Sequence, residues 1–139
     1  PAVPTPEQRQ LLQQRVAARA TLVEELKNES RVGVRTTQEI LDGEERLYLA
    51  TKALNVARVM AKTTVRLPEF EQEIAEAELA ALGELRIALE NQLQVTQQRV
   101  AIGELTKTDV HQETAALLDT KYGESQIRSN LARLRKIKE

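Results

Sequence analysis

The chain has 139 residues and a formal net charge of −1; 41% of its residues are hydrophobic and 2% are aromatic. The balanced charge excludes the strongly basic surface typical of nucleic-acid-binding proteins, so we predict no nucleic-acid partner. Cysteine is absent, which excludes disulfides and thiol catalysis. His111 is the only histidine, so histidine-based zinc sites and Ser-His-Asp machinery have almost no residues to use. We therefore predict no enzyme, no metal site and no cofactor.

Glycine and proline are scarce, with five and four residues, and three of the prolines fall within the first six positions. A long chain rich in Ala, Leu, Glu, Gln, Lys and Arg predicts an all-α fold of long helices. The first predicted helix begins at Pro6, with Thr5 as its N-cap, and ends near Ser30. Its apolar residues keep helical spacing at Leu12, Val16, Val23 and Leu26.

A break at residues 31–36 follows, because Gly33 interrupts the helical pattern. Thr36 stands three residues before Glu39, the spacing of a capping box, which predicts a second helix over 37–64. Apolar residues recur at seven-residue steps, and each of the first three is followed three positions later by a small residue, which predicts a close coiled-coil seam. These positions are Ile40, Leu47, Leu54 and Ala61, with Gly43, Ala50 and Ala57.

The central break is predicted at residues 63–69, since the residue before Pro68 is pushed out of the helical region. A third helix is predicted over 69–101, with a second break at 102–108 and a fourth helix over 108–138. Thr106 and Asp109 form a weaker capping box at that second break. The seven-residue pattern of the third helix is Ile74, Ala81, Ala88, Val95 and Ile102, and the fourth carries Val110, Leu117, Ile127, Leu131 and Leu134.

The two glycine breaks repeat one another at an offset of 70 residues, with Gly33 aligned on Gly103. The predicted architecture is two long antiparallel helical hairpins in coiled-coil packing. The first covers 1–66, with its tip at 31–36, and the second covers 67–139, with its tip at 102–108. Such hairpins cannot bury their apolar faces alone, so packing beside further hairpins is expected.

Residues 32–47 read VGVRTTQEILDGEERL, and residues 100–110 read VAIGELTKTDV. The first segment resembles the periplasmic tip of TolC-family outer-membrane efflux channels, in which a VGxRT turn leads into an acidic-apolar-Leu-Asp-Ala run. The second resembles the tip of the other repeat of that family. The resemblance covers nearly all of the chain except its first residues and its centre.

The resemblance implies a homotrimer whose hairpins form part of a hollow α-helical barrel in the periplasm, below the outer membrane. The tips would dock the hairpin tips of a membrane-fusion adaptor and gate the exit duct of a tripartite multidrug efflux or type I secretion system. An inner-membrane pump would be an indirect partner. The family's outer-membrane strands are absent and the order of the two tips is inverted, so we expect a fragment or an engineered joining of the tip region.

The tips supply the residues predicted to bind the adaptor. Apolar side chains at a solvent-facing turn favour docking, and glycine permits a close approach of backbones. The alternative is that the two exposed apolar residues only close their own hairpins. The predicted residues are Val32, Gly33, Val34, Arg35, Thr36, Ile102, Gly103, Glu104, Leu105 and Thr106.

A second group is predicted to form the aperture. In the family the arginine matching Arg35 bonds the neighbouring hairpin, at positions that correspond here to Thr108 and Asp109; Ser30 replaces a tyrosine that completes this network in some members. The alternative is a solvated loop arginine. Glu39 and Asp42 would form acidic rings that favour cations, or only compensate a helix dipole.

Other function classes compete with the channel. A helical bundle that serves only as a scaffold or oligomerisation module is one alternative, and the coiled-coil hairpin of the adaptor is another. His111 is predicted to be a surface or seam residue, and the many acidic residues are predicted to be mostly a solvated face. No run of residues is long and apolar enough for a membrane span or a signal peptide, so the chain itself is expected to be soluble.

Overall fold

The computed structural model describes residues 3–33, 35–62 and 67–138. These residues form four α-helices and no strand, which confirms the predicted all-α fold. The helices are α1 (Pro6–Arg31), α2 (Thr37–Lys62), α3 (Leu67–Ala101) and α4 (Lys107–Lys138). They have 26, 26, 35 and 32 residues, so α3 is about 52 Å long at ~1.5 Å per residue.

The helix ends follow local sequence rules, but α3 and α4 begin earlier in the chain than predicted. At the start of α1, Thr5 and Gln8 form a reciprocal capping box, with distances of 2.8 and 3.1 Å between the backbone nitrogens and the side-chain oxygens. The predicted central break is wrong at residues 67–69, which belong to α3. A helix accepts proline in its first turn, because the amide that proline lacks would have no acceptor within the helix there. Residues 63–66 of that break lie outside the described residues. The fourth helix begins one residue early, at Lys107.

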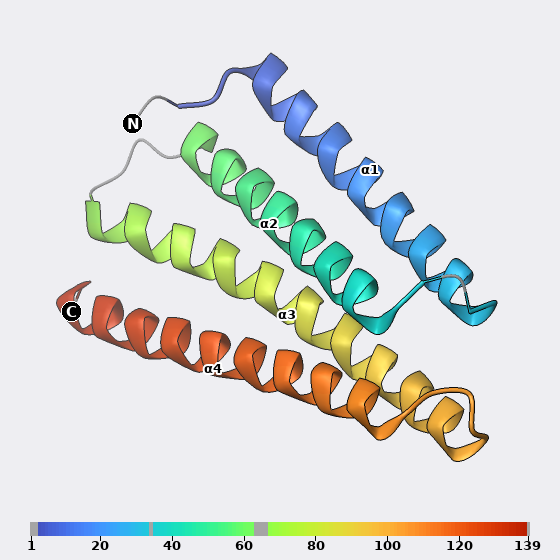
Figure 1. The fold of residues 1–139 in the computed structure, drawn as a ribbon. Helices are drawn as coiled ribbons and strands as arrows, with labels where there is room; N and C mark the ends of the chain where they lie inside the picture. Colours follow the sequence, from blue (N-terminus) through green and yellow to red (C-terminus); the bar gives the residue numbers. More distant parts are fainter. Residues whose placement is uncertain (1–2, 34, 63–66, 139) are drawn as a thin grey trace.

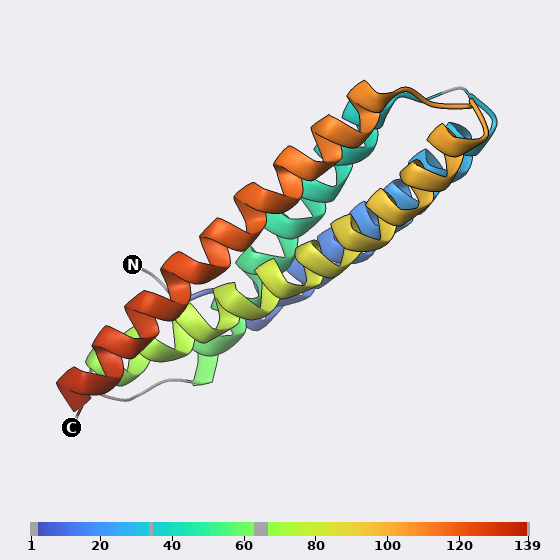
Figure 2. The same cartoon turned by 90° about the horizontal axis from the view of Figure 1, so that it is seen from below.

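The helices stand side by side in chain order, and both turns between paired helices lie at the same end (Figure 1). Seen from below, α2 and α4 lie in one layer and α1 and α3 in the other (Figure 2). Among the described residues, the backbone of α1 approaches only α2, whereas α2 also packs against α3 and α4. The fold is therefore an open row of helices, in which α1 does not return to α4.

The buried seam of the first hairpin follows the predicted seven-residue pattern closely. Ile40, Ala50, Leu54 and Ala57 are buried, although Ala61 at the end of the pattern is exposed. A Cβ placed on Gly43 would lie 2.9 Å from Cδ1 of Leu26, so the two helices of this hairpin approach closely at the glycine. Small residues thus set the spacing of α1 and α2.

The predicted pattern of α3 is only partly correct. Ala81 is buried, but Val95 is 40% exposed and Ile102 is 70% exposed. The buried register lies one residue further along, at Ala75, Leu82, Leu89 and Thr96. An α-helix packed against two neighbours needs a wider buried face than one seam provides, and its seven-residue pattern drifts by ~20° per heptad in a straight helix.

Candidate functional site

The two tips have the same glycine geometry. Each turn contains a glycine in the left-handed region, with φ of 80° at Gly33 and 82° at Gly103. The Gly33 amide donates to the carbonyl of Ser30, and the Gly103 amide donates to the carbonyl of Val100, both at 3.0 Å. A Cβ on either glycine would meet nothing within 4 Å, so glycine is required here by backbone conformation and not by crowding.

The first tip is held by a charged network within its own hairpin. The Thr36 amide donates to Oε1 of Glu39 at 3.3 Å, and the Glu39 amide donates to the Thr36 hydroxyl at 3.2 Å, which completes the predicted capping box. Arg35 donates to Glu29 and, at 3.1 Å, to Oε2 of Glu39. The hydrogen bond to Glu29 raises the pKa of Arg35, and the backbone amide of Thr36 lowers the pKa of Glu39.

These contacts differ from the expectation that Arg35 bonds Thr108 and Asp109. Within the described chain the Arg35 guanidinium pairs with two glutamates of its own hairpin, and Thr108 is exposed at the second tip. A guanidinium that already has two carboxylate partners leaves the contact between hairpins to other groups. Asp109 does make such a contact, but with a different residue.

The contact between the tips is made by Asp109. Its Oδ2 accepts from the amide and hydroxyl of Thr106 at 3.0 and 3.1 Å, and its Oδ1 accepts from the buried hydroxyl of Thr37 at 2.6 Å. The hydrogen bond from Thr37 is the main cause that lowers the pKa of Asp109. One carboxylate therefore caps α4 and ties it to the start of α2.

Arg99 forms the second contact between the tips. Its guanidinium donates to the carbonyl of Ser30 at 3.1 Å and to the Ser30 hydroxyl at 3.4 Å, and it pairs with Glu104 of its own tip at 3.0 Å. Ser30 is buried in the last turn of α1, and Arg99 reaches it from α3. The two tips form a single end surface.

The remaining predicted tip residues lie at this end. Val32 is 75% exposed and Ile102 is 70% exposed, so these side chains do not close their own hairpins. Leu105 is half-buried, and Val34 lies outside the described residues. Asp42 is exposed one turn along α2 from the capping residues and accepts from Gln38 at 2.8 Å.

Three buried glutamates were missed by the expectation of a mostly solvated acidic face. Glu44 pairs with Lys27 at 2.9 Å, and Glu124 pairs with Arg86 at 2.8 Å. Glu113 is 0% exposed; its Oε1 accepts from the Thr96 hydroxyl at 2.5 Å, and its Oε2 has no hydrogen-bond partner among the described residues. Burial raises the pKa of Glu113.

The sequence contained a signal for two of these glutamates. Glu124 lies seven residues after the apolar Leu117, and Glu113 lies on the buried register that Thr120 and Leu134 continue at multiples of seven. Acidic residues at such positions face the partner helix, where they need a cation or a hydrogen-bond donor. Glu44 has no comparable marker and is recognised only beside Lys27.

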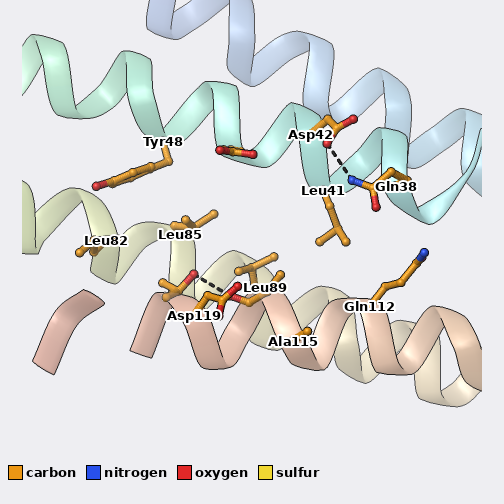
Figure 3. A pocket seen from close by; sticks show the side chains of 13 residues that line it. Gln38, Leu41, Asp42, Tyr48, Leu82, Leu85, Leu89, Gln112, Ala115 and Asp119 are labelled. Atoms are coloured by element: carbon orange, nitrogen blue, oxygen red, sulfur yellow. Dashed lines mark hydrogen bonds between the residues drawn. The ribbon is translucent and has the colours of Figure 1, made fainter. Parts of the chain in front are cut away.

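A groove runs between α2 and α4 with α3 as its floor, and has a volume of about 530 Å³ (Figure 3). Leucine side chains from α3, Leu82, Leu85 and Leu89, form the floor. We call this feature the α2–α4 groove. Its other lining residues are Gln38, Leu41, Asp42, Glu45 and Tyr48 of α2 and Gln112, Ala115, Ala116, Asp119 and Thr120 of α4.

Several kinds of site are absent from the residues that the structure describes. No group of three or more acidic, histidine or cysteine side chains could hold a metal ion there, and His111 is exposed. In the same residues, no helix has both the length and the apolar character needed to cross a bilayer. The described chain offers contact surfaces at its tips and along the α2–α4 groove.

Comparison with known proteins returned no match to a family model, to a curated protein or to a solved structure.

Proposed function

We propose that this chain is a tip region of a TolC-type periplasmic α-barrel, in which the paired tips dock a membrane-fusion adaptor and gate an export duct. The single observation that carries the proposal is the joined end surface. Two glycine turns lie at one end, where the Thr37–Asp109 and Arg99–Ser30 hydrogen bonds join them. The turns expose Val32 and Ile102 to solvent. Exposed apolar residues at adjacent turns form a surface suited to protein contact.

The open row of helices also supports a place in a larger wall. A stand-alone four-helix bundle places its helices around one core, so its first and last helices are neighbours. Here the backbone of α1 approaches only α2 among the described residues. The outer sides of α1 and α4 are thus available to other hairpins, which favours the barrel over the scaffold alternative. In the proposed channel, three copies complete the periplasmic barrel beneath the outer membrane.

The aperture in this proposal uses the acidic residues near the tips. Glu39 and Asp42, repeated by threefold symmetry, would form the rings that favour cations over anions. Arg35 contributes by holding Glu39 in place, since both carboxylate partners of this guanidinium lie in its own hairpin. Asp109 would couple the two hairpins, and Thr108 would stand exposed at the rim of the aperture.

The test is binding to a panel of purified helical hairpins from membrane-fusion adaptors, measured by titration calorimetry. The tip variant carries Val32→Asp and Ile102→Asp, which leave both glycine turns unchanged. The matched control carries Leu11→Asp and Leu118→Asp, two exposed apolar residues away from the tips. We expect the tip variant to bind at least tenfold more weakly and the control to bind like the original chain. Binding by no adaptor, or equal losses in both variants, would contradict the proposal.

Oligomeric state provides a separate measurement. Light scattering of the purified chain should detect a species of three times 15.6 kDa if the tip region assembles without the rest of a channel. A monomer that still binds an adaptor hairpin through its tips would retain the docking part of the proposal and remove self-assembly from it.

A further inference from the structure

The α2–α4 groove is long enough to receive one face of a short helix. Its lining on α2 extends from Gln38 to Tyr48, a span of about 15 Å at ~1.5 Å per residue. Both walls are helices that run in the same direction, away from the tips, and the floor is the antiparallel helix α3 (Figure 1). About three turns of a helix, at ~5.4 Å per turn, would span this length with one face in the groove.

The chemistry of the groove is apolar at its base and acidic at its edges. The leucines of α3 supply the base, and Leu41 points into the groove from α2, as Figure 3 shows. Asp42 and Glu45 lie on one wall and Asp119 on the opposite wall, and no lysine or arginine is among the lining residues. This charge pattern contrasts with the nearly neutral chain as a whole, which has 20 basic and 21 acidic residues.

We propose that the α2–α4 groove binds an amphipathic helix of a partner protein that carries leucine-type residues on one face and lysine or arginine on both flanks. The apolar face would pack on the leucines of α3, as in other helix-in-groove complexes. Basic residues on the two flanks would meet Asp42 and Glu45 on one side and Asp119 on the other. Carboxylates on both walls also disfavour an acidic helix, so they select for charge and fix the helix along the groove.

This proposal does not depend on docking at the tips. Val32 and Ile102 do not line the groove, so the tip variant Val32→Asp/Ile102→Asp should bind a groove ligand with unchanged affinity. Failure of tip docking and failure of groove binding are therefore separate outcomes.

The probe is a fluorescein-labelled helical peptide of about 14 residues, with leucines on one face and lysines on both flanks; the matched peptide has glutamate in place of lysine. Binding is measured by anisotropy at ~0.15 M salt, where screening limits unspecific attraction. We expect the lysine peptide to bind and the glutamate peptide to bind at least tenfold more weakly. No binding of the lysine peptide, or equal binding of both peptides, would overturn the proposal.

Two sets of variants locate the site. The groove variant carries Asp42→Asn, Glu45→Gln and Asp119→Asn, and should lose at least tenfold in affinity. The control carries Glu25→Gln, Glu71→Gln and Glu84→Gln, three exposed positions outside the groove with the same change in net charge. The control should remain within twofold of the original chain, and an equal loss in both would overturn the proposal.

A third variant blocks the groove without removing a carboxylate. Ala115→Lys places a long cation at an exposed position of the wall, where a helix tolerates lysine. It should weaken the lysine peptide at least tenfold while thermal unfolding by circular dichroism stays unchanged. Amide NMR shifts on binding should concentrate on α2, α3 and α4, and shifts confined to α1 would overturn the assignment of the site. Saturable binding of a small hydrophobic cation, with no binding of the peptide, would overturn the assignment of a helix as the ligand.

Discussion

The two hairpins share one plan but differ at equivalent positions of their cores. At the offset of 70 residues, Gly43 and Leu26 of the first hairpin correspond to Glu113 and Thr96 of the second. The first pair forms a close apolar contact, and the second pair is a buried hydrogen bond of 2.5 Å. Equivalent positions between two helices are thus occupied by a leucine against a glycine in one hairpin and by polar side chains in the other.

The comparison extends to a position about three turns further along α4, at ~3.6 residues per turn. Glu124 stands where the first hairpin has the buried Leu54, and it is balanced by Arg86 at 2.8 Å and by Arg128 at 3.4 Å. A buried ion pair adds little net stability, because desolvation offsets the Coulomb attraction, but it penalises other registers of α3 on α4. At these two equivalent positions the second hairpin uses polar pairing where the first uses apolar contacts, although the first hairpin has a buried ion pair of its own between Lys27 and Glu44.

The two tips also differ in the contacts made by their capping acids, Glu39 and Asp109. Both capping acids use one carboxylate oxygen for the backbone of their own turn. The second oxygen of Glu39 binds Arg35 in the same hairpin, whereas that of Asp109 accepts from Thr37 in the other hairpin. Equivalent positions thus perform a local task at one tip and a joining task at the other.

The largest effect is expected from the joining carboxylate. Asp109→Ala removes a helix cap and the charged hydrogen bond from Thr37, and should lower the free energy of unfolding by about 2 kcal/mol. Glu39→Ala, which removes only local contacts, should cost clearly less. Urea unfolding of the two variants measures the difference, and equal losses would contradict the assignment of separate tasks to the two acids.

The acid dependence of the same contact follows from its lowered pKa. A carboxyl group whose pKa is lower in the folded state stabilises the fold above its unfolded pKa of ~3.9, and this stabilisation is lost as the pH falls through the folded pKa. The original chain should therefore exceed Asp109→Ala in stability near neutral pH and lose that advantage in acid. Repeating the urea curves from neutral pH into acid measures this.

The two glycine turns should respond alike, in contrast to the capping acids. Gly33→Ala and Gly103→Ala each force an L side chain into the left-handed region, at a cost of about 1 kcal/mol. Neither new Cβ meets an atom within 4 Å, so strain of the backbone is the only expected term. Thermal unfolding of both variants checks this, and a loss at one turn alone would mean that the tips differ in backbone as well as in side chains.

Glu113→Gln sharpens the contrast between the two cores. Burial raises the pKa of Glu113, so the folded chain binds an extra proton and its stability falls as the pH rises from the unfolded value of ~4.3 through the raised folded value. The neutral amide removes this slope. Above the folded pKa the variant should be more stable by about 1 kcal/mol, the scale of one unsatisfied buried group. A variant less stable at every pH would show that the carboxylate is required.

The smallest effect is expected at Arg35. Its side chain and those of Glu29 and Glu39 are each about two-fifths exposed, and exposed ion pairs contribute little to stability. Arg35→Ala should leave the unfolding midpoint unchanged within error. Arg99→Ala, by comparison, should lower the midpoint, since Arg99 contacts the buried Ser30 across the two hairpins. Similar results for the two arginines would remove the distinction between a local and a joining tip.

The sequence by itself determined the features that depend on near neighbours in the chain. Thr5, the Thr36–Glu39 capping box and the two glycines specified where helices begin and end, because caps and left-handed turns involve residues only three or four positions apart. The seam of the first hairpin was also predictable, since it follows one regular pattern. The resemblance to a channel family remains a prediction.

Only the tertiary structure decided which groups meet across the row of helices. The burial of Thr96 in place of Val95 depends on α3 having neighbours on two sides, and the bond between Thr37 and Asp109 joins residues 72 positions apart. The acidic groove likewise exists only because α2 and α4 stand together over α3. A periodic pattern specifies one face of a helix, but the direction of that face and its partners follow from the assembled packing of all four helices.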